Sequence, residues 1–321
     1  MSSADLGSSL PVRTPRARQR GRHRRPQPLQ VPPGAPPLVL AVPDTDGSPD
    51  PRLAQEIASL VRAERPGVQI LLTAGPGAVR ATLAELAELR RARRSADGAG
   101  DRSEQDAGPV AIVVPLLVAP VEGVIEELRK AVVASGVEAV VTDPLGPHPV
   151  LAEALHVRLS EAGLARADRA RLFTVSMAAD GIVLATAGGE AAVAEAQTTG
   201  VLLAARLAVP VLPASVDVPG SVAAAAEQLR ASGAGRIAVA PFLIGPEADS
   251  GRWRADAEQA GCECAEPLGA YSGIAPLILE RYVPLVGVVP EEEPAGDAPA
   301  EEPAVATRAA HAAPAAERPA P

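Results

Sequence analysis

The stretch DPLGPHP, residues 143–149, decides the fold of this chain, because its PLG tripeptide returns 123 positions later at residues 267–269. Each copy follows a short strand-like run and precedes a segment with helical spacing. Two further runs return in the same order: LVLA (38–41) is answered by IVLA (182–185), and AIVVPLLV (111–118) by IAVAPFLI (237–244). A repeat of this length is a whole lobe rather than a solenoid unit. The sequence therefore predicts two similar lobes in one chain.

Within the first repeat, short β-branched runs alternate with stretches of helical spacing. The predicted buried strands are Leu38–Val42, Val68–Thr73, Val110–Val114 and Val137–Val141. Between them, apolar residues such as Leu53, Ile57 and Leu60 recur at helical intervals. This alternation predicts an α/β fold, with a parallel sheet covered by helices on both faces in each lobe. Folds of this kind bind ligands at the outer ends of the strands and in the crevice between lobes.

Composition divides the chain into four parts. Residues 1–37 form a basic, proline-rich head, with seven arginines against Asp5 in the first 25 residues. Residues 38–163 form the first lobe, with a polar surface insertion at 90–108, and residues 164–287 form the second lobe. Residues 288–321 form an acidic Pro/Ala-rich tail with seven acids against two arginines. We expect both ends to be disordered, because they hold too little apolar surface to offset the entropy of ordering.

Charge and composition exclude several classes of partner. The net charge is −9, of which the ends contribute +6 and −5, leaving −10 on the residues between them. An acidic body argues against nucleic acid as the main ligand. The sequence has no apolar run long enough to span a membrane. Two cysteines, Cys262 and Cys264, do not make a secreted disulfide framework, so we expect a cytoplasmic protein.

The segments VVPLLVAPVEGVIEEL (113–128) and DPLGPHPVLAEAL (143–155) resemble the class II chelatases. This family includes the sirohydrochlorin cobaltochelatases and ferrochelatases of cobalamin and sirohaem synthesis, and the resemblance to its two-repeat form covers residues 38–287. It implies two lobes, each a three-layer αβα sandwich with a four-stranded parallel sheet. It also implies a tetrapyrrole bound between them and Co²⁺ or Fe²⁺ as the metal substrate, with no cofactor required. Two lobes in one chain replace a dimer, so we expect a monomer with pseudo-two-fold symmetry.

The resemblance places catalytic histidines at two turns, and this sequence has none at either. The first turn, near Val42, reads AVPDTDGS (41–48), and the second carries Gly123 at the matching position. Carboxylates nearby offer replacement metal ligands: Asp44, Asp46 and Glu122. The alternative is structural, since Asp is common in turns and Glu in the first turn of a helix.

Other candidates follow the PLG tripeptides and the first strand of the second repeat. His148 is the best remaining imidazole, a candidate for binding metal or substrate, or else a structural residue of the turn. Tyr271 occupies the same place in the second repeat. Gly188 and Gly189 precede a helix whose N–H groups suit an anion such as a porphyrinoid carboxylate. Cys262 and Cys264 are either a soft-metal or redox pair or two small buried side chains.

Three functional hypotheses follow. The chain is a chelatase that uses carboxylates and His148, or a catalytically degenerate relative that binds a tetrapyrrole or metal as a sensor or carrier, or a scaffold that acts through its charged ends. Loss of general-base help reduces a rate by about 10² to 10⁴, which need not abolish activity. We favour a sirohydrochlorin chelatase-like protein that has lost most of its catalytic machinery.

Overall fold

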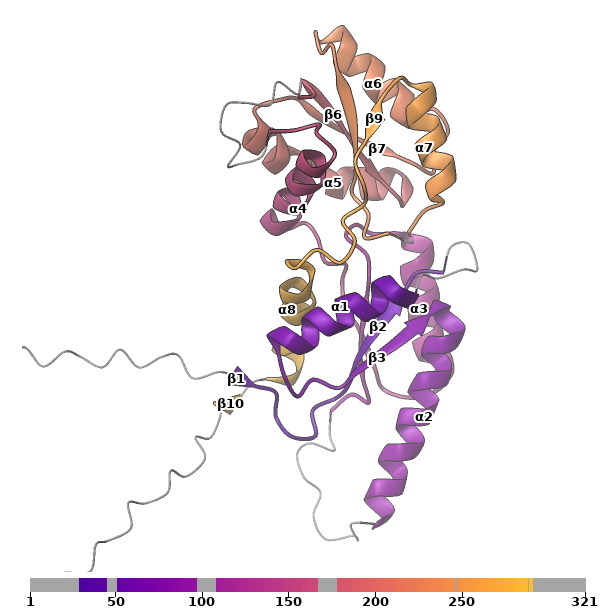
Figure 1. Ribbon diagram of the computed structural model, residues 1–321. Coiled ribbons are helices and arrows are strands. Elements are labelled where there is room, and N and C mark those ends of the chain that lie inside the picture. The colour runs from indigo at the N-terminus through magenta and orange to yellow at the C-terminus, as the bar shows by residue number, and fades with distance from the viewer. Residues whose placement is uncertain are drawn as a thin grey trace, which may run out of the picture. The chain divides into compact units, whose positions relative to one another are not determined.

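The computed structural model describes residues 29–44, 51–96, 108–166, 178–245, 247–287 and 289–290. Within them the chain forms an α/β fold with two separate four-stranded parallel sheets, one from each repeat (Figure 1). The duplicated α/β architecture predicted from the repeats is confirmed.

The first sheet has the strand order β3-β2-β4-β5. Its strands are β2 (Leu38–Val42), β3 (Ile70–Ala74), β4 (Ile112–Pro115) and β5 (Val140–Val141). The central strand β2 is buried along its whole length, as an uninterrupted apolar run predicts for a strand covered on both faces. Its alternate residues enter different cores, because successive side chains point to opposite faces: Leu38 and Leu40 enter one, Val39 and Ala41 the other.

The second sheet has the corresponding order β7-β6-β8-β9. Its strands are β6 (Gly181–Thr186), β7 (Val211–Ser215), β8 (Ile237–Pro241) and β9 (Glu263–Cys264). Strand β7 is the one that the sequence pattern did not indicate. It is only partly buried and contains Pro213. An edge strand tolerates proline because the missing N–H falls on the unpaired side, and β7 pairs with β6 alone.

Helices cover both faces of each sheet, giving two three-layer sandwiches. They are α1 (Pro51–Glu64), α2 (Gly75–Ala96), α3 (Glu122–Ser135), α4 (Pro149–Glu161), α5 (Gly189–Leu207), α6 (Ser221–Ala231), α7 (Ser250–Gln259) and α8 (Ile274–Val286). Helices α2 and α3 share one apolar core with the first sheet, and α6 and α7 share another with the second. The opposite faces of both sheets contribute to a third core, together with α1, α4, α5 and α8.

The last helix of each repeat lies on the sheet of the other repeat. Helix α8 contacts β4 and α1, whereas α4 contacts β8 and α5. Both helices enter the third core, which contains Leu40 of the first sheet and Leu184 of the second, together with Leu155 of α4 and Ile278 of α8. The predicted boundary at residues 163 and 164 therefore separates the two sheets but not their shared core, and residues 29–289 form one compact unit.

The segment 31–37 contacts α8, where the Tyr282 hydroxyl donates to the Pro36 carbonyl at 2.7 Å. Helix α2 continues through Arg90 to Ala96, into the range of the predicted insertion at 90–108. Two short strands, β1 (Leu29–Gln30) and β10 (Val289–Pro290), pair with each other. The predictions for residues 1–28, 97–107 and 291–321 lie outside the described residues.

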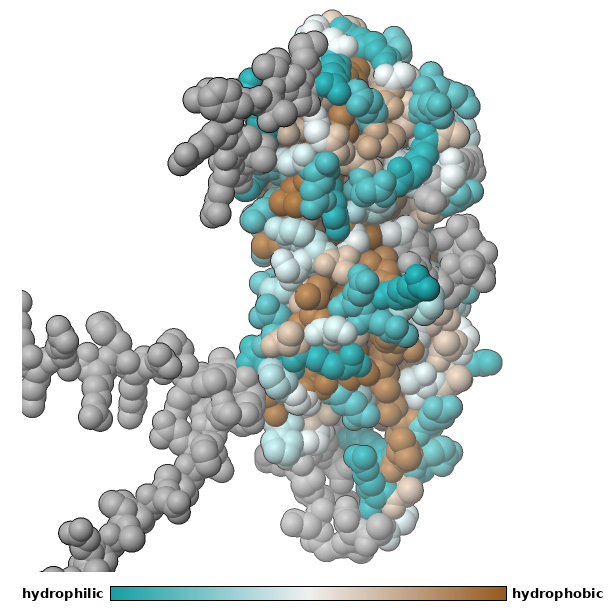
Figure 2. Space-filling model, viewed as in Figure 1, coloured by the Kyte–Doolittle hydropathy of each residue, from teal (hydrophilic) through white to brown (hydrophobic). Residues whose placement is uncertain are grey.

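No helix in the described part of the chain is both long and apolar enough to cross a bilayer. On the face shown in Figure 2, hydrophobic and hydrophilic residues are interspersed. The large apolar side chains that are exposed lie on different elements, among them Leu72 of β3, Val133 of α3 and Val201 of α5. They are thus spread over several elements.

Candidate functional site

The predicted site residues that the structure describes all follow the carboxyl ends of strands. Asp44 follows β2, Glu122 and Gly123 follow β4, His148 follows β5, Gly188 and Gly189 follow β6, and Tyr271 follows β9. The carboxyl edge is where open parallel sheets bind ligands. Each residue is therefore on the edge of its sheet that its place in the sequence predicts.

Close contacts bring loops of the two repeats together. Gly188, after β6, lies so near the carbonyl oxygen of Pro120, after β4, that a Cβ at this position would collide with it. A Cβ at Gly245, after β8, would lie 2.7 Å from the Leu53 side chain, in the first turn of α1. We refer to the described residues that follow β4, β6 and β8 as the interlobe loops. Their contacts join the carboxyl edges of both sheets in one region.

The two glycines after β6 have different surroundings. Gly188 has a φ of 108° and caps α5, and its N–H donates to the Asp217 carboxylate. That N–H is therefore already used by an anion of the chain itself. Gly189 has a φ of 65°, and a Cβ added there would have no heavy atom within 4 Å. Of the two, Gly189 has the open surroundings that a bound carboxylate needs.

The carboxylates proposed as metal ligands are dispersed. Asp44 is exposed and its side chain lies beside Gly75, at the start of α2. Glu122 is exposed in the first turn of α3, where an acidic side chain interacts favourably with the helix dipole. Among the described residues no three His, Cys, Asp or Glu side chains are placed to hold a metal, so Asp44, Glu122 and His148 do not form one ligand set. Asp46 lies outside the described residues.

His148 is the N-cap residue of α4. Its Nδ1 accepts the N–H of Val150 at 3.2 Å. A neutral imidazole that accepts through Nδ1 carries its proton on Nε2. Nε2 lies 3.8 Å from the carboxylate of Glu280 in α8, and the side chain is 32% exposed. A metal ion that bound through Nε2 would require the other tautomer, and that tautomer breaks the cap.

Tyr271 does not repeat the role of His148. Its hydroxyl donates to Glu153 of α4 at 3.3 Å, and burial together with the charge of Glu153 raises its pKa. Helix α8 begins only at Ile274, with Gly273 as its N-cap, so Tyr271 is not a cap. The tyrosine instead contacts the helix that begins directly after His148. The phenol remains a protonated donor at neutral pH.

Glu247 is a site residue that the sequence reasoning did not select. It lies in the interlobe loop after β8, is 4% exposed, and accepts the N–H groups of Ile244 and Gly245, each at 2.6 Å. Burial raises its pKa from 4.5 to about 7, against the lowering effect of the two hydrogen bonds. The sequence feature that could have identified Glu247 is its turn, which follows β8 and corresponds to the turn with Gly123 after β4 in the first repeat. A carboxyl group that titrates near neutrality is suited to accepting protons.

His156, which the sequence did not single out as a candidate, and the two candidate cysteines occupy structural positions. His156 is buried between α4 and α5, accepts from Arg206 at 2.8 Å through Nδ1 and donates to the Arg166 carbonyl at 2.7 Å. Burial raises the pKa of the Cys262 thiol, and raises that of Cys264 to about 11. Both thiols are therefore protonated at neutral pH, whereas metal binding and nucleophilic attack require the thiolate.

Comparison with solved structures shows the fold. SirB from Bacillus subtilis with Fe³⁺ aligns with a TM-score of 0.51 at 14% identity, covering 78% of this chain and 96% of the other. The sirohydrochlorin chelatase SirB from Bacillus subtilis subspecies spizizenii, in complex with cobalt, aligns with a TM-score of 0.49 at 14% identity, covering 78% and 95%. No protein-family model matches this chain, and no curated protein matches it significantly. The chain has a chelatase-like fold with two lobes.

Proposed function

We propose that this protein is chelatase-like, and that it binds a carboxylated tetrapyrrole of the sirohydrochlorin type with a divalent metal such as Co²⁺ or Fe²⁺. The binding site is formed by the interlobe loops, which include Gly189, together with the turns after β5 and β9, which carry His148 and Tyr271 as further candidate contacts. The protein retains the binding function of a chelatase and inserts the metal slowly or not at all.

The observation that carries this proposal is the duplicated fold that the chain shares with SirB along nearly the whole of that protein. The contacts of Gly188 with Pro120 and of Gly245 with Leu53 support it, because they bring the ligand-binding edges of both sheets into one region. The proposed ligand class follows from SirB, which is described as a sirohydrochlorin chelatase and was crystallised with cobalt.

The chemistry of the loops supports binding more strongly than turnover. Metal insertion needs a donor that holds the ion and a base that accepts the pyrrole protons, roles that suit a neutral imidazole. His148 is engaged as a helix cap, and the sequence has no histidine at the two places where the resemblance expects one, near Val42 and at Gly123. Glu247 is a buried carboxyl group whose pKa of about 7 suits a proton acceptor at neutral pH. Both of its oxygens, however, already accept backbone N–H groups.

The test is an absorbance titration of the purified protein with sirohydrochlorin, followed by addition of Co²⁺. We expect a shift of the tetrapyrrole spectrum on mixing with protein, and insertion at the rate of a protein-free control. An unshifted spectrum would overturn the binding proposal. Metal insertion well above the control rate would contradict the proposal that the protein inserts metal slowly or not at all, and would identify a working chelatase.

A pair of variants separates binding from folding. His148→Asn keeps a side-chain acceptor for the Val150 N–H, since Asn is a favourable cap, but removes the imidazole. Gly189→Asn places a side chain in the open space at the start of α5, and Asn tolerates the positive φ of this position. We expect both variants to weaken the tetrapyrrole shift without loss of helix content. Exposed Val133 on α3, replaced by Ala, is the matched control that leaves the shift unchanged.

A further inference from the structure

The edge strands of the two four-stranded sheets differ in their protection against pairing with another chain. Strands β5 and β9 contain two residues each, and β9 includes Glu263. Strand β7 contains five residues, among them Pro213. Short length, charge and proline are the usual means by which a protein prevents another chain from adding to a sheet edge. Strand β3 also contains five residues, ILLTA, but it has no proline and no charged residue.

The backbone groups of Leu72, in the middle of β3, are directed away from the first sheet. The Leu38 N–H donates to the Gln69 carbonyl at 2.9 Å, so the backbone groups of Gln69 face β2. Because successive residues of a strand direct their backbone groups to alternate sides, those of Ile70, Leu72 and Ala74 face outward. Within the described residues β3 pairs with β2 alone, and Leu72 is 37% exposed. This edge therefore presents a backbone donor and acceptor beside an exposed leucine.

The second repeat has a proline at the position that matches Leu72. In the first sheet, Leu72 is paired with Leu40 of β2. In the second sheet, Pro213 is paired with Leu184 of β6, and Leu184 is the residue that repeats Leu40. Proline has no N–H, so β7 lacks the outward donor that β3 keeps at this position. Of the two five-residue edges, only the one in the second repeat is blocked.

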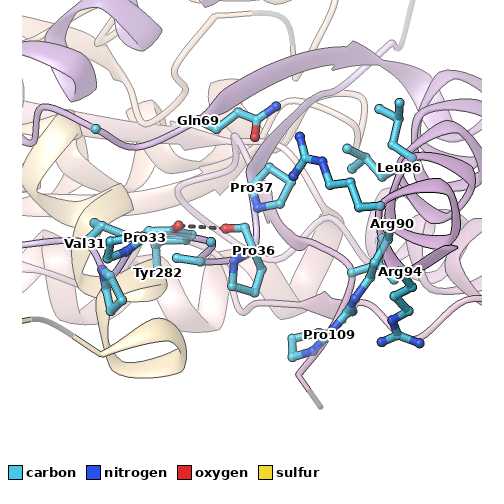
Figure 3. A pocket seen from close by; sticks show the side chains of 17 residues that line it. Val31, Pro33, Pro36, Pro37, Gln69, Leu86, Arg90, Arg94, Pro109 and Tyr282 are labelled. Atoms are coloured by element: carbon cyan, nitrogen blue, oxygen red, sulfur yellow. Dashed lines mark hydrogen bonds between the residues drawn. The ribbon is translucent and has the colours of Figure 1, made fainter. Parts of the chain in front are cut away.

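The accessible edge is limited to the length of β3. Gly67, shortly before the strand, has a φ of 91°, and Gly75, directly after it, has a φ of 71° and begins α2. The chain changes direction at both positions. Gln69, between Gly67 and the strand, lines a cavity at the amino edge of the sheet together with Pro37 (Figure 3). An added strand can therefore follow residues 70–74 and no further.

We propose that β3 pairs with β3 of a second copy of this chain, antiparallel and across a two-fold axis at Leu72. This register places Leu72 opposite itself and Ile70 opposite Ala74 of the partner subunit, so the outward backbone groups of the two strands meet. Because neither strand carries a charge, no like charges oppose each other across the axis. The pairing joins two four-stranded sheets into one continuous sheet, and the two exposed leucines contact each other.

The proposed dimer is separate from the candidate tetrapyrrole site. It uses the lateral edge of the first sheet, whereas the interlobe loops follow the carboxyl ends of the strands. The expectation of a monomer rested on the duplication, which joins two lobes but leaves this lateral edge accessible. Loss of the dimer should therefore leave the binding of a tetrapyrrole unchanged.

The test is sedimentation velocity of the full chain over a range of protein concentrations, combined with amide hydrogen exchange. We expect the mass to rise with concentration from the 32.6 kDa of one chain to twice that value. The Leu72 N–H should exchange slowly in concentrated protein and quickly in dilute protein. A single-chain mass at every concentration would overturn the proposal, and so would a dimer in which exchange of the Leu72 N–H does not change.

Variants locate the contact. Leu72→Lys places two like charges opposite each other and should raise the dissociation constant of the dimer by about tenfold or more. Val201→Lys is the matched control, because it makes the same kind of change at an exposed position of α5 and should leave the dimer unchanged. Equal dissociation constants for these two variants would place the contact elsewhere and contradict the assignment.

A third variant transfers the protection of the second repeat to the first. Leu72→Pro introduces the residue that β7 has at this position and removes the outward N–H, so it should abolish the dimer. Circular dichroism checks that helix content is retained. If the proline variant loses helix content, the comparison of Leu72→Lys with Val201→Lys decides the question.

Discussion

Arg158 and Arg281 perform the same task for opposite repeats. Arg158 of α4 donates through Nε and Nη2 to the Leu268 carbonyl, at 3.1 and 2.7 Å. Arg281 of α8 donates through the same two nitrogens to the carbonyls of Pro144 and Leu145, at 3.0 and 3.4 Å. The two arginines are 123 positions apart, which is also the separation of the two PLG tripeptides that they hold. The internal symmetry therefore extends from the strands to the bonds that join the repeats.

These arginines should contribute measurably to stability. Replacing either Arg158 or Arg281 by Ala should lower the free energy of unfolding by about 1.5–3 kcal/mol, the usual contribution of a hydrogen bond to a charged donor. Replacement by Lys should recover only part of the loss, because Lys lacks the planar fork that presents two donors together. Denaturant unfolding monitored by circular dichroism measures both effects.

The control for this experiment is Arg91→Ala, which removes an exposed pair with Glu88. It should cost less than about 1 kcal/mol. If the Arg158 and Arg281 variants lost no more than this control, solvent would be satisfying the carbonyls and the arginines would not join the repeats.

Gly188 and Gly189 provide a second matched pair. Both have positive φ, so substitution by Ala strains the backbone at either position. At Gly188 the added Cβ also collides with Pro120 and lies 2.8 Å from Ala192 Cβ, whereas at Gly189 it meets open space. We expect Gly188→Ala to lower stability by about 1–3 kcal/mol more than Gly189→Ala, the usual cost of overpacking. Equal thermal shifts for the two variants would mean that the loops separate freely at this contact.

Glu247 should make stability depend on pH in a definite direction. Its pKa is 4.5 when exposed and about 7 in the folded protein, so the folded state binds more protons between these values. Stability from this group is fully present below pH 4.5 and is lost as the pH rises through 7, by about 3 kcal/mol in total.

The variant Glu247→Gln should remove this decline, and unfolding measured at intervals from pH 4.5 to 8 tests the prediction. The comparison concerns the slope with pH rather than the level, because Gln presents an NH₂ group to one of the two backbone N–H groups that Glu247 accepts. An identical slope in the wild type and the variant would show that Glu247 does not titrate in this range.

His148 has a stabilising role that is separable from ligand binding. His148→Ala removes the acceptor for the Val150 N–H and should lower stability by about 0.5–2 kcal/mol, whereas His148→Asn should lower it less. Thermal unfolding without ligand measures this difference. A larger loss for Asn than for Ala would show that the imidazole stabilises α4 through its packing or its proximity to Glu280 rather than as a cap.

The strands and helices were predictable to the extent that their pattern is local. Leu38–Val42 is a continuous apolar run, and β2 occupies those residues because a central strand is buried on both faces. Strand β7 escaped prediction because an edge strand needs no such run and accepts Pro213. The sequence pattern did not indicate how far α2 extends, because residues 90–96 have no apolar face and nevertheless continue the helix; residues 91–95 are exposed and Arg90 is half-buried.

The strand that each candidate residue follows was predictable from the sequence, whereas the surroundings of its side chain were not. The order of strands and turns predicted that His148, Gly188 and Tyr271 follow the carboxyl ends of strands, and the carboxyl ends of parallel strands share an edge of the sheet. Nothing in that order distinguished Glu247 from Glu122, although they follow corresponding strands. One is buried and bonded to its own loop, and the other is exposed at the start of a helix. Burial depends on which residues cover a side chain, and the order of strands and turns does not specify those residues.

Residue order alone thus established the duplication, the α/β class and the edge that carries the candidate loops, because periodicity and repetition are properties of neighbouring residues. Three features became apparent only in the folded chain. They are the packing of α4 and α8 on the sheet of the opposite repeat, the core that both repeats share, and the pKa of Glu247, which burial raises. Each of these depends on tertiary packing. The packing of α4 and α8 shows this most directly, because the hydrogen bonds of Arg158 and Arg281 join residues 110 or more positions apart. No local pattern encodes which partners will meet at that separation.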